Sequence, residues 1–162
     1  MKVLLTGNRG YIGSVLIPLL AARGHAVIGY DTGYYHGCEL YPFNGAVREI
    51  QKDIRDASAG DLEDIDAVIH LAALSNDPLG ELDARLTQEI NFSATLRLAE
   101  LAKAAGVKRF VFASSQSMYG VSPSDLELDE EKSEKHPVTA YARTKWEAEQ
   151  ELAKICARDF TV

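Results

Sequence analysis

The feature that most constrains the fold is a glycine-rich stretch near the N-terminus. In TGNRGYIGS (Thr6–Ser14), glycines stand at every third position, Gly7, Gly10 and Gly13, directly after the apolar run Val3–Leu5. Glycine adopts backbone conformations that other residues avoid, and it lets neighbouring backbone atoms approach closely. The stretch either binds a phosphate through backbone N–H groups or only makes a tight turn between a strand and a helix. The rest of the chain has to decide between these two interpretations.

Apolar periodicity along the chain predicts strands that alternate with helices. The expected strands are Lys2–Thr6, Ala26–Tyr30, Val47–Lys52, Asp66–Leu71 and Arg109–Ala113, with a sixth opening at Asp159–Val162. The first expected helix is Ile12–Arg23, with an apolar face of Ile12, Val15, Leu16, Leu19 and Leu20 and with Pro18, a residue that can kink helices. The others are a long helix marked by Leu86, Ile90, Ala94, Leu98, Leu101 and Ala105, and Ala140–Ala157.

Strands that alternate with helices and are apolar on both faces indicate an α/β fold, a doubly wound parallel sheet of Rossmann type. Such sheets bind ligands at the carboxyl ends of their strands. The chemically distinctive residues of this chain all stand at expected strand ends: Gly7, Asp31, Asp53, Ala72 and Ser115. That agreement favours a binding site over a simple turn.

Composition narrows the function further. The chain has 162 residues, 46% of them hydrophobic, and a net charge of −7, so we expect one domain, 1–162, that binds no nucleic acid. The sequence lacks the ~20-residue apolar run of a membrane span and opens directly on a strand, so we expect no signal peptide and a cytoplasmic location. Cys38 and Cys156 have no metal-ligand spacing, so we expect free thiols and no metal. The charge-rich Ser124–Lys135 is expected to be a solvated loop rather than a lid.

The first half of the chain predicts a dinucleotide site. Asp31 stands where a carboxylate hydrogen-bonds the adenosine ribose, and Asp53 and Ile54 are placed to bracket the adenine, although an ordinary turn explains the latter pair equally well. Asp31 would repel a ribose 2′-phosphate, whereas Arg9 could neutralise one, so NAD is favoured over NADP on the more direct contact. The pyrophosphate would lie against the loop and helix start, formed by Gly7, Arg9, Gly10, Tyr11, Ile12 and Gly13.

The second half predicts catalytic groups. Tyr141 and Lys145 lie on one face of an expected helix, where an ammonium can stabilise a phenolate and make it a base. Free tyrosine, with a pKa near ~10, is a poor base at neutral pH. Taken alone, the pair is more typical of a solvated helix surface than of a catalytic site. Ser115 follows the fifth expected strand, where its hydroxyl could hydrogen-bond the reacting oxygen.

Taken together, these motifs resemble the extended short-chain dehydrogenase/reductase family, the NAD-dependent nucleotide-sugar epimerases and dehydratases. The resemblance runs over essentially the whole chain. It is carried by TGNRGYIGS, DIRD (Asp53–Asp56), VIHLAA (Val68–Ala73), NFSATLRLAELAKAAGVKRFVFASS (Asn91–Ser115) and YARTK (Tyr141–Lys145).

The resemblance implies a catalytic set of Ser115, Tyr141 and Lys145, supported by Asn91. It also implies a fourth-strand wall to the cofactor, formed by Leu71, Ala72 and Ala73. Ser115 is preferred to Ser114 and Ser117 by counting back from Tyr119. We expect His70 to be a core histidine rather than a catalytic one.

Family members are usually about twice this long, so we expect the substrate-binding C-terminal domain to be missing and the chain alone to be inactive. The resemblance implies an NAD-dependent epimerase acting on a nucleotide-sugar, and a homodimer formed through the helices near 85–105 and 140–157. Dehydratases of the family place acidic residues just after the catalytic hydroxyl, where this chain has Gln116 and Ser117. A dehydratase, an NADPH-dependent carbonyl reductase and a non-enzymatic dinucleotide-binding regulator are the alternatives.

Overall fold

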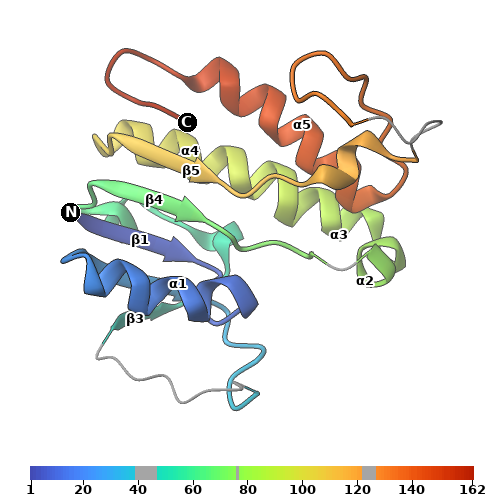
Figure 1. Ribbon diagram of the computed structural model, residues 1–162. Helices are drawn as coiled ribbons and strands as arrows, with labels where there is room; N and C mark the ends of the chain where they lie inside the picture. Colours follow the sequence, from blue (N-terminus) through green and yellow to red (C-terminus); the bar gives the residue numbers. More distant parts are fainter. Residues whose placement is uncertain (39–46, 76, 122–126) are drawn as a thin grey trace.

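The protein folds around one parallel sheet with helices on both faces (Figure 1). The structure, a computed structural model, describes residues 1–38, 47–75, 77–121 and 127–162. The strand order is β3-β2-β1-β4-β5. The strands are β1 (Lys2–Thr6), β2 (Ala26–Asp31), β3 (Arg48–Gln51), β4 (Ala67–His70) and β5 (Arg109–Phe112), each within two residues of its expected bounds.

Helix α1 (Tyr11–Ala22) lies in front of the sheet in Figure 1, and α4 (Ala94–Ala104) lies behind it, beside α5 (Ala140–Ile155). Two short helices, α2 (Asp77–Leu82) and α3 (Ala84–Gln88), precede α4. Short 3₁₀ turns are η1 (Ile54–Asp56), η2 (Ala59–Leu62) and η4 (Gln116–Tyr119). The doubly wound arrangement expected from the sequence is therefore confirmed.

The main core lies between the sheet and the layer of α4 and α5. Its buried members include Leu4, Val68 and Phe110 from the strands and Leu98, Ala102 and Leu152 from the helices. Val3, Leu4 and Leu5 are all buried, although successive side chains of a strand point to opposite faces. β1 is therefore covered on both faces, as the central strand of a parallel sheet must be.

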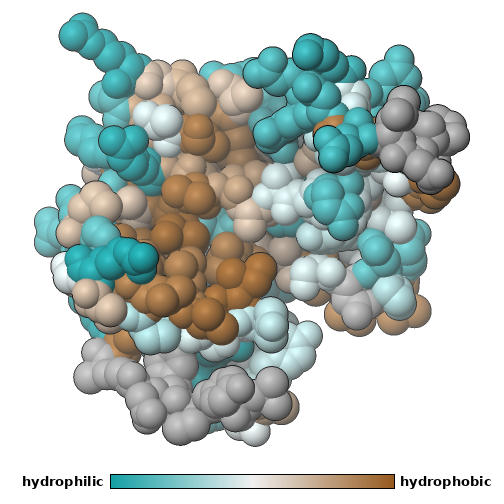
Figure 2. Space-filling view, viewed as in Figure 1, coloured by the Kyte–Doolittle hydropathy of each residue, from teal (hydrophilic) through white to brown (hydrophobic). Residues whose placement is uncertain are grey.

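The expected apolar face of α1 is wrong. Ile12, Val15 and Leu19 are 59%, 53% and 48% exposed, and the buried residues of the helix are Gly13 and Ile17. The helix packs through a glycine, which brings its backbone close to the loop and rotates the larger apolar residues outward. The helix continues through Pro18. Figure 2 shows apolar side chains gathered over this side of the molecule.

The long helix expected around 86–105 is present, but it is not a regular α-helix throughout. α3, a π turn, η3 (Glu89–Ser93), and α4 follow one another without a break in the helical backbone. Asn91 lies in this π turn. Isolated π turns within helices occur frequently at functional sites, and periodicity alone does not reveal them.

The sixth strand expected at the C-terminus opens where the sequence predicts it. Thr161 forms a parallel bridge with Arg109 of β5. The Phe110 N–H donates to Thr161 O at 2.8 Å, and the Thr161 N–H donates to Lys108 O at 3.0 Å. Phe160 is buried beside Phe110, so this strand start belongs to the core.

Several predictions concern the surface of the molecule. Cys38 and Cys156 are exposed free thiols. Residues 127–135 are mostly exposed, as expected for a solvated loop, while 124–126 lie outside the described residues. In the described part of the chain, every helix is too short or too polar to cross a bilayer. The homodimer through α4 and α5 stays a prediction.

Candidate active site

The glycine loop between β1 and α1 is shaped by close backbone approaches. Gly7 has a φ of +70°, and a Cβ on it would lie 2.8 Å from Ala72 N. A Cβ on Gly13 would lie 2.3 Å from Gly7 O, which no rearrangement of a side chain could relieve. Both positions therefore require glycine on geometric grounds. The loop is pressed against the end of β4 and against its own helix.

The start of α1 is open to an anion. Its N-cap is Gly10, which has no side chain to bond the first-turn N–H groups, and Tyr11, Ile12 and Gly13 come next as uncharged residues. The first N–H groups of a helix have no partner within the helix, and the helix dipole places partial positive charge there. The cradle thus fits a pyrophosphate group.

Asp31 is fixed at the end of β2 beside this loop. Its carboxylate accepts from the Arg9 N–H at 3.1 Å and from the Gly33 N–H at 2.8 Å. A carboxylate has about four lone-pair sites, so these two bonds leave capacity for a ribose hydroxyl. The structure therefore brings Asp31 to the glycine loop, as the sequence predicts.

A pocket of about 210 Å³ opens at this end of the sheet, lined by Asn8, Arg9, Asp31, Gly33, His36, Glu49, Ile50 and Gln51. Typical pockets for a whole ligand measure ~300–1,000 Å³, so this one has the size for part of a ligand, such as a ribose. The Arg9 guanidinium bonds Glu49 and contacts His36 Nδ1 at 3.0 Å.

Glu49 was missed by sequence reasoning. It belongs to β3 and pairs with Gly29 of β2, so the strand order brings it to the loop from far along the chain. A doubly wound sheet usually places the third strand beside the second. That rule is the signal from which the position of Glu49 beside the loop could have been predicted.

Helix α5, which packs beside the end of β5, carries Tyr141 and Lys145. Lys145 is 2% exposed, which excludes a solvated surface pair. Its Nζ donates to Ala113 O at 2.8 Å and lies 4.6 Å from the Phe112 ring centroid and 5.9 Å from that of Tyr141. Burial lowers the pKa of Lys145 from 10.5 to about 8.

The serines after β5 point to different partners. Ser114 Oγ donates to Glu149 on α5 at 2.5 Å. Ser115 caps η4, its Oγ accepting from the Ser117 N–H at 3.2 Å, and this leaves the hydroxyl proton to be donated elsewhere. Because Lys145 bonds the carbonyl of Ala113, Ser115 comes soon after the residue that holds the lysine. Ser114 is engaged with Glu149, and the choice of Ser115 as the reacting hydroxyl stays a prediction.

Comparison with known proteins decides the family. The model of the NAD dependent epimerase/dehydratase family matches residues 3–161. This chain belongs to that family. UDP-glucose 4-epimerase of Rhizobium meliloti (strain 1021) is 33% identical over 93% of this chain and 46% of its own length. UDP-glucose 4-epimerase of Klebsiella pneumoniae is 37% identical over 76% of this chain and 95% of its own length.

A solved structure, that of MoeE5 in complex with UDP-glucose and NAD, superposes with a TM-score of 0.82. It is 33% identical, and the match covers 99% of this chain and 51% of MoeE5. The chain therefore spans about half the length of MoeE5 and of the Rhizobium relative.

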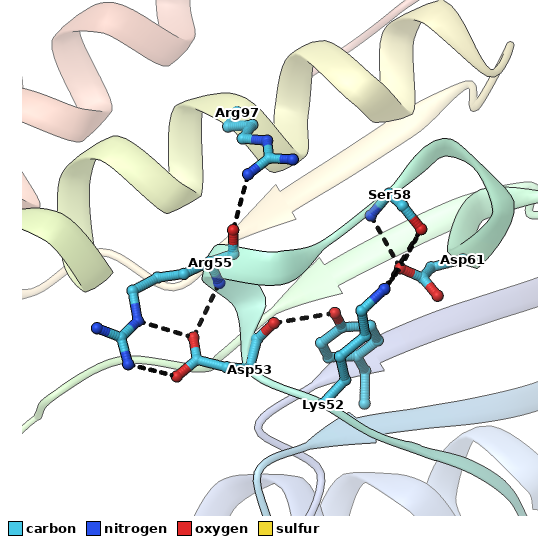
Figure 3. Close-up of polar contacts among 7 residues, drawn as sticks. Lys52, Asp53, Arg55, Ser58, Asp61 and Arg97 are labelled. Atoms are coloured by element: carbon cyan, nitrogen blue, oxygen red, sulfur yellow. Dashed lines mark hydrogen bonds and ion pairs between the residues drawn. The ribbon is translucent and has the colours of Figure 1, made fainter.

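The DIRD motif of this epimerase/dehydratase chain forms the turn η1 (Figure 3). Asp53 caps the turn by accepting from the Arg55 N–H at 2.9 Å, and it binds the Arg55 guanidinium at 2.8 and 3.1 Å. The Arg55 hydrogen bonds hold the pKa of Asp53 below its usual range. Ile54 is buried, and the Asp53 carbonyl accepts from Tyr30 OH at 3.1 Å. Contact of Asp53 and Ile54 with an adenine stays a prediction.

Further polar contacts fix this turn against the rest of the fold. Arg97 of α4 donates to Arg55 O at 2.7 Å, and Lys52 binds Asp61 at 2.7 Å (Figure 3). Asp61 also accepts from the Ser58 N–H and hydroxyl, at 2.8 and 2.9 Å. These contacts join η1 and the segment after it to each other and to α4.

The VIHLAA motif forms the wall next to the glycine loop. The Leu71 and Ala72 N–H groups both donate to Thr6 Oγ1 at 3.2 Å, which ties the end of β4 to the end of β1. Leu71, Ala72 and Ala73 are half-buried, so their surface remains accessible at the strand edge. Their contact with a cofactor stays a prediction.

His70 is a core histidine, as expected. Its ring nitrogens lie 2.7 Å from Thr6 Oγ1 and 2.9 Å from Thr95 Oγ1, and the residue is fully buried. Burial, with the nearby charge of Lys145, lowers the pKa of His70 from 6.5 to about 3. The imidazole is therefore neutral at physiological pH and serves as a hydrogen-bonded link.

Asn91 joins three segments of the chain: the π turn in which it lies, the segment after β4 and helix α5. Its Oδ1 accepts from the Leu74 N–H at 2.8 Å, and its Nδ2 donates to Leu74 O at 3.0 Å and to Thr144 Oγ1 at 3.5 Å. Since Asn91 is completely buried, these contacts support the residue as a positioning group. A direct contact with a cofactor stays a prediction.

Proposed function

We propose that the protein to which this chain belongs is an NAD-dependent epimerase acting on a nucleotide-activated sugar. One observation carries the proposal: a buried lysine ammonium lies beside Tyr141 at the same sheet edge as the glycine loop and Asp31. MoeE5, a relative of similar fold, binds UDP-glucose and NAD, which supports this choice of ligands.

The described residues fit NAD. The open start of α1 would hold the pyrophosphate, Asp31 would accept from the adenosine ribose, and Ala72 and Ala73 would line the site. NAD when bound supplies a hydride acceptor, and in its reduced form a hydride donor. NADP is disfavoured because Asp31 would face the ribose and Arg9 is already bound to a carboxylate, Glu49.

Tyr141 would remove the proton of the sugar 4-hydroxyl as its carbon loses hydride. The Lys145 ammonium, held by Ala113 O, stabilises the phenolate that this requires. Ser115 would donate its hydroxyl proton to the same sugar oxygen as a hydrogen bond and so position it. After the 4-keto sugar turns over, Tyr141 returns the proton as hydride is delivered to the other face, so the reaction has no net redox change.

Epimerisation is favoured over elimination by the residues next to Ser115. Loss of water from a 4-keto sugar needs a further acid and base for the C5 proton and the departing 6-hydroxyl. Gln116 and Ser117 of η4 cannot act as carboxylate acids or bases at neutral pH. A non-enzymatic regulator is disfavoured because Ser115, Tyr141 and Lys145 are all present in the sequence.

The test is the mass of the product formed by the full-length protein from UDP-sugars, measured together with the cofactor that remains bound. The expected result is a C4 epimer of unchanged mass and NAD that stays with the protein without net reduction. A product lighter by one water would replace the epimerase with a dehydratase. Stoichiometric consumption of NADPH would replace it with a reductase.

A further inference from the structure

An ion pair between Arg9 and Glu49 forms part of the lining of the pocket beside β2 and β3. The Arg9 guanidinium binds the Glu49 carboxylate at 2.5 Å, with side chains only 18% and 26% exposed. The backbone of the same arginine donates to Asp31. Arg9 thus bonds one carboxylate, that of Glu49, through its guanidinium and a second, that of Asp31, through its backbone N–H.

Glu49 is held in this position by a second bond. Asn8 Nδ2 donates to Glu49 Oε1 at 2.8 Å, and Asn8 is completely buried. The Asn8 side chain lies against Gly29, where an added Cβ would come within 2.5 Å of Nδ2, so the amide cannot shift toward β2. Glu49 thus binds two consecutive residues of the glycine loop, one through an amide and the other through a guanidinium.

We propose that Glu49 sets the preference for NAD over NADP by binding the guanidinium of Arg9. The proposal rests on the proposed function, in that the site holds a nicotinamide dinucleotide. An arginine in this loop would otherwise be suited to a ribose 2′-phosphate, because guanidinium groups bind phosphate in a bidentate manner. A 2′-phosphate would bring a charge of about −1.5 to −2 toward Asp31 and Glu49 and would have to displace Glu49 from Arg9.

Asp31 and Glu49 therefore have different roles. Asp31 would contact the ribose hydroxyls directly, and so contributes to binding of either dinucleotide. Glu49 acts through Arg9, so it is a specificity-determining residue whose removal leaves the ribose contact in place. A change at Glu49 should alter NADP binding far more than NAD binding.

The experiment is calorimetric binding of NAD and NADP, each measured separately, to the full-length protein and its Glu49→Gln variant. Glutamine keeps the shape and can still accept from Asn8, but it removes the charge. The change removes a negative charge beside the Arg9 guanidinium and a group that competes with a phosphate for it, so NADP binding should tighten by about tenfold or more. The NAD dissociation constant should change by less than about threefold.

Two controls separate this mechanism from a general charge effect. Glu63→Gln removes an exposed carboxylate next to η2, outside the pocket residues, and should leave the ratio of the two affinities unchanged. Adding Arg9→Gln to Glu49→Gln should abolish the gain in NADP affinity. Glu49→Thr, with a side chain that suits an edge strand, removes the same charge if the glutamine variant fails to fold.

The outcomes are distinct. If the parent binds NAD and the folded Glu49 variants keep its NAD:NADP ratio, the role of Glu49 is overturned while the proposed function stands. If the gain survives removal of Arg9, the effect does not act through Arg9 and the proposal fails. If the full-length parent binds neither dinucleotide, the proposed function fails and this inference falls with it.

Discussion

The two cations of the site, Arg9 and Lys145, are held in opposite ways. Arg9 lies in the glycine loop, partly exposed, and its guanidinium binds the carboxylate of Glu49. Lys145 lies on α5, almost completely buried, donates to the Ala113 carbonyl and lies over the Phe112 ring. In the part of the chain that the structure describes, Lys145 forms an ion pair with no carboxylate.

The difference indicates that the charge of Lys145, rather than that of Arg9, can act on a neighbouring group. A buried ammonium without a counter-ion opposes folding, because desolvation favours its neutral form. Its pKa of about 8 still leaves most of the lysine protonated at pH 7. A cation retained at such a cost, and left uncompensated, can stabilise a phenolate at Tyr141. A cation that is already paired with a carboxylate attracts a negatively charged ligand much less strongly.

The largest test of this contrast is Tyr141→Phe in the full-length protein. General acid–base groups contribute ~10²–10⁴-fold, so turnover should fall by at least ~100-fold. NAD affinity should stay nearly unchanged, since the phenyl ring is kept and only the hydroxyl is lost. Steady-state kinetics with NAD titration measures both quantities. Tyr35→Phe at the exposed opposite end is the control, and near-normal turnover of Tyr141→Phe would assign the proton transfer to another group.

The second test concerns His70, which the same buried region keeps neutral. Its folded pKa of about 3 is below the ordinary 6.5, so the unfolded chain binds a proton that the folded chain does not. Stability should therefore fall as pH decreases from about 6.5 toward 3, by up to ~1.4 kcal/mol per pH unit from this group. His70→Gln should lose that component of the slope, whereas the exposed His136→Gln should keep it. Urea unfolding at several pH values measures it, and equal slopes in all three proteins would contradict the prediction.

The third test replaces the uncompensated cation by Lys145→Met. The folded pKa of about 8 lies below the ordinary 10.5, so the buried charge costs stability below pH 8 and this cost disappears as pH rises through 8 to 10.5. The variant should gain about 1–2 kcal/mol at pH 7 and lose the rise in stability over that window. The Lys145→Met variant should also show a lower turnover rate and a lower affinity for NAD. A less stable variant would show that the contacts of Lys145 outweigh the cost of burying its charge.

The smallest effect is expected at the compensated end, from Asp31→Ala. Removing this carboxylate deletes one ribose contact and one repulsive charge, so the preference for NAD over NADP should shrink by about three- to tenfold. The two dissociation constants, measured by calorimetry on the full-length protein, give the ratio. A parent that binds NADP as well as NAD would make Arg9, rather than Asp31, the governing residue.

Local pattern predicted the parts of this site that depend on one segment of chain. The glycine loop is predicted by the spacing of Gly7, Gly10 and Gly13, and Asp31 by its place after an apolar strand. Tyr141 and Lys145 are predicted by their spacing of one helical turn. In each case the chemistry and the geometry come from residues close in sequence.

The parts that escaped prediction depend on tertiary packing. Glu49 reaches Arg9 only because β3 lies beside β2, and the outward face of α1 results from the close approach of Gly13 to Gly7. The burial of Lys145 depends on Phe112 and Ala113 of a different segment. Helical periodicity indicates that one face is buried, but it does not say which face a glycine contact will select.

The π turn at Glu89–Ser93 has a consequence for how this region can vary between related proteins. A π turn contains one residue more than an α turn, so it rotates the helix before it by about 100° relative to the helix after it. Asn91 can therefore reach Leu74 and Thr144 while Leu98 and Ala102, farther along, still face the core. Deleting a single residue here would restore a regular helix and turn Asn91 away from its partners. The number of residues in this segment is therefore constrained as tightly as the identity of the residues.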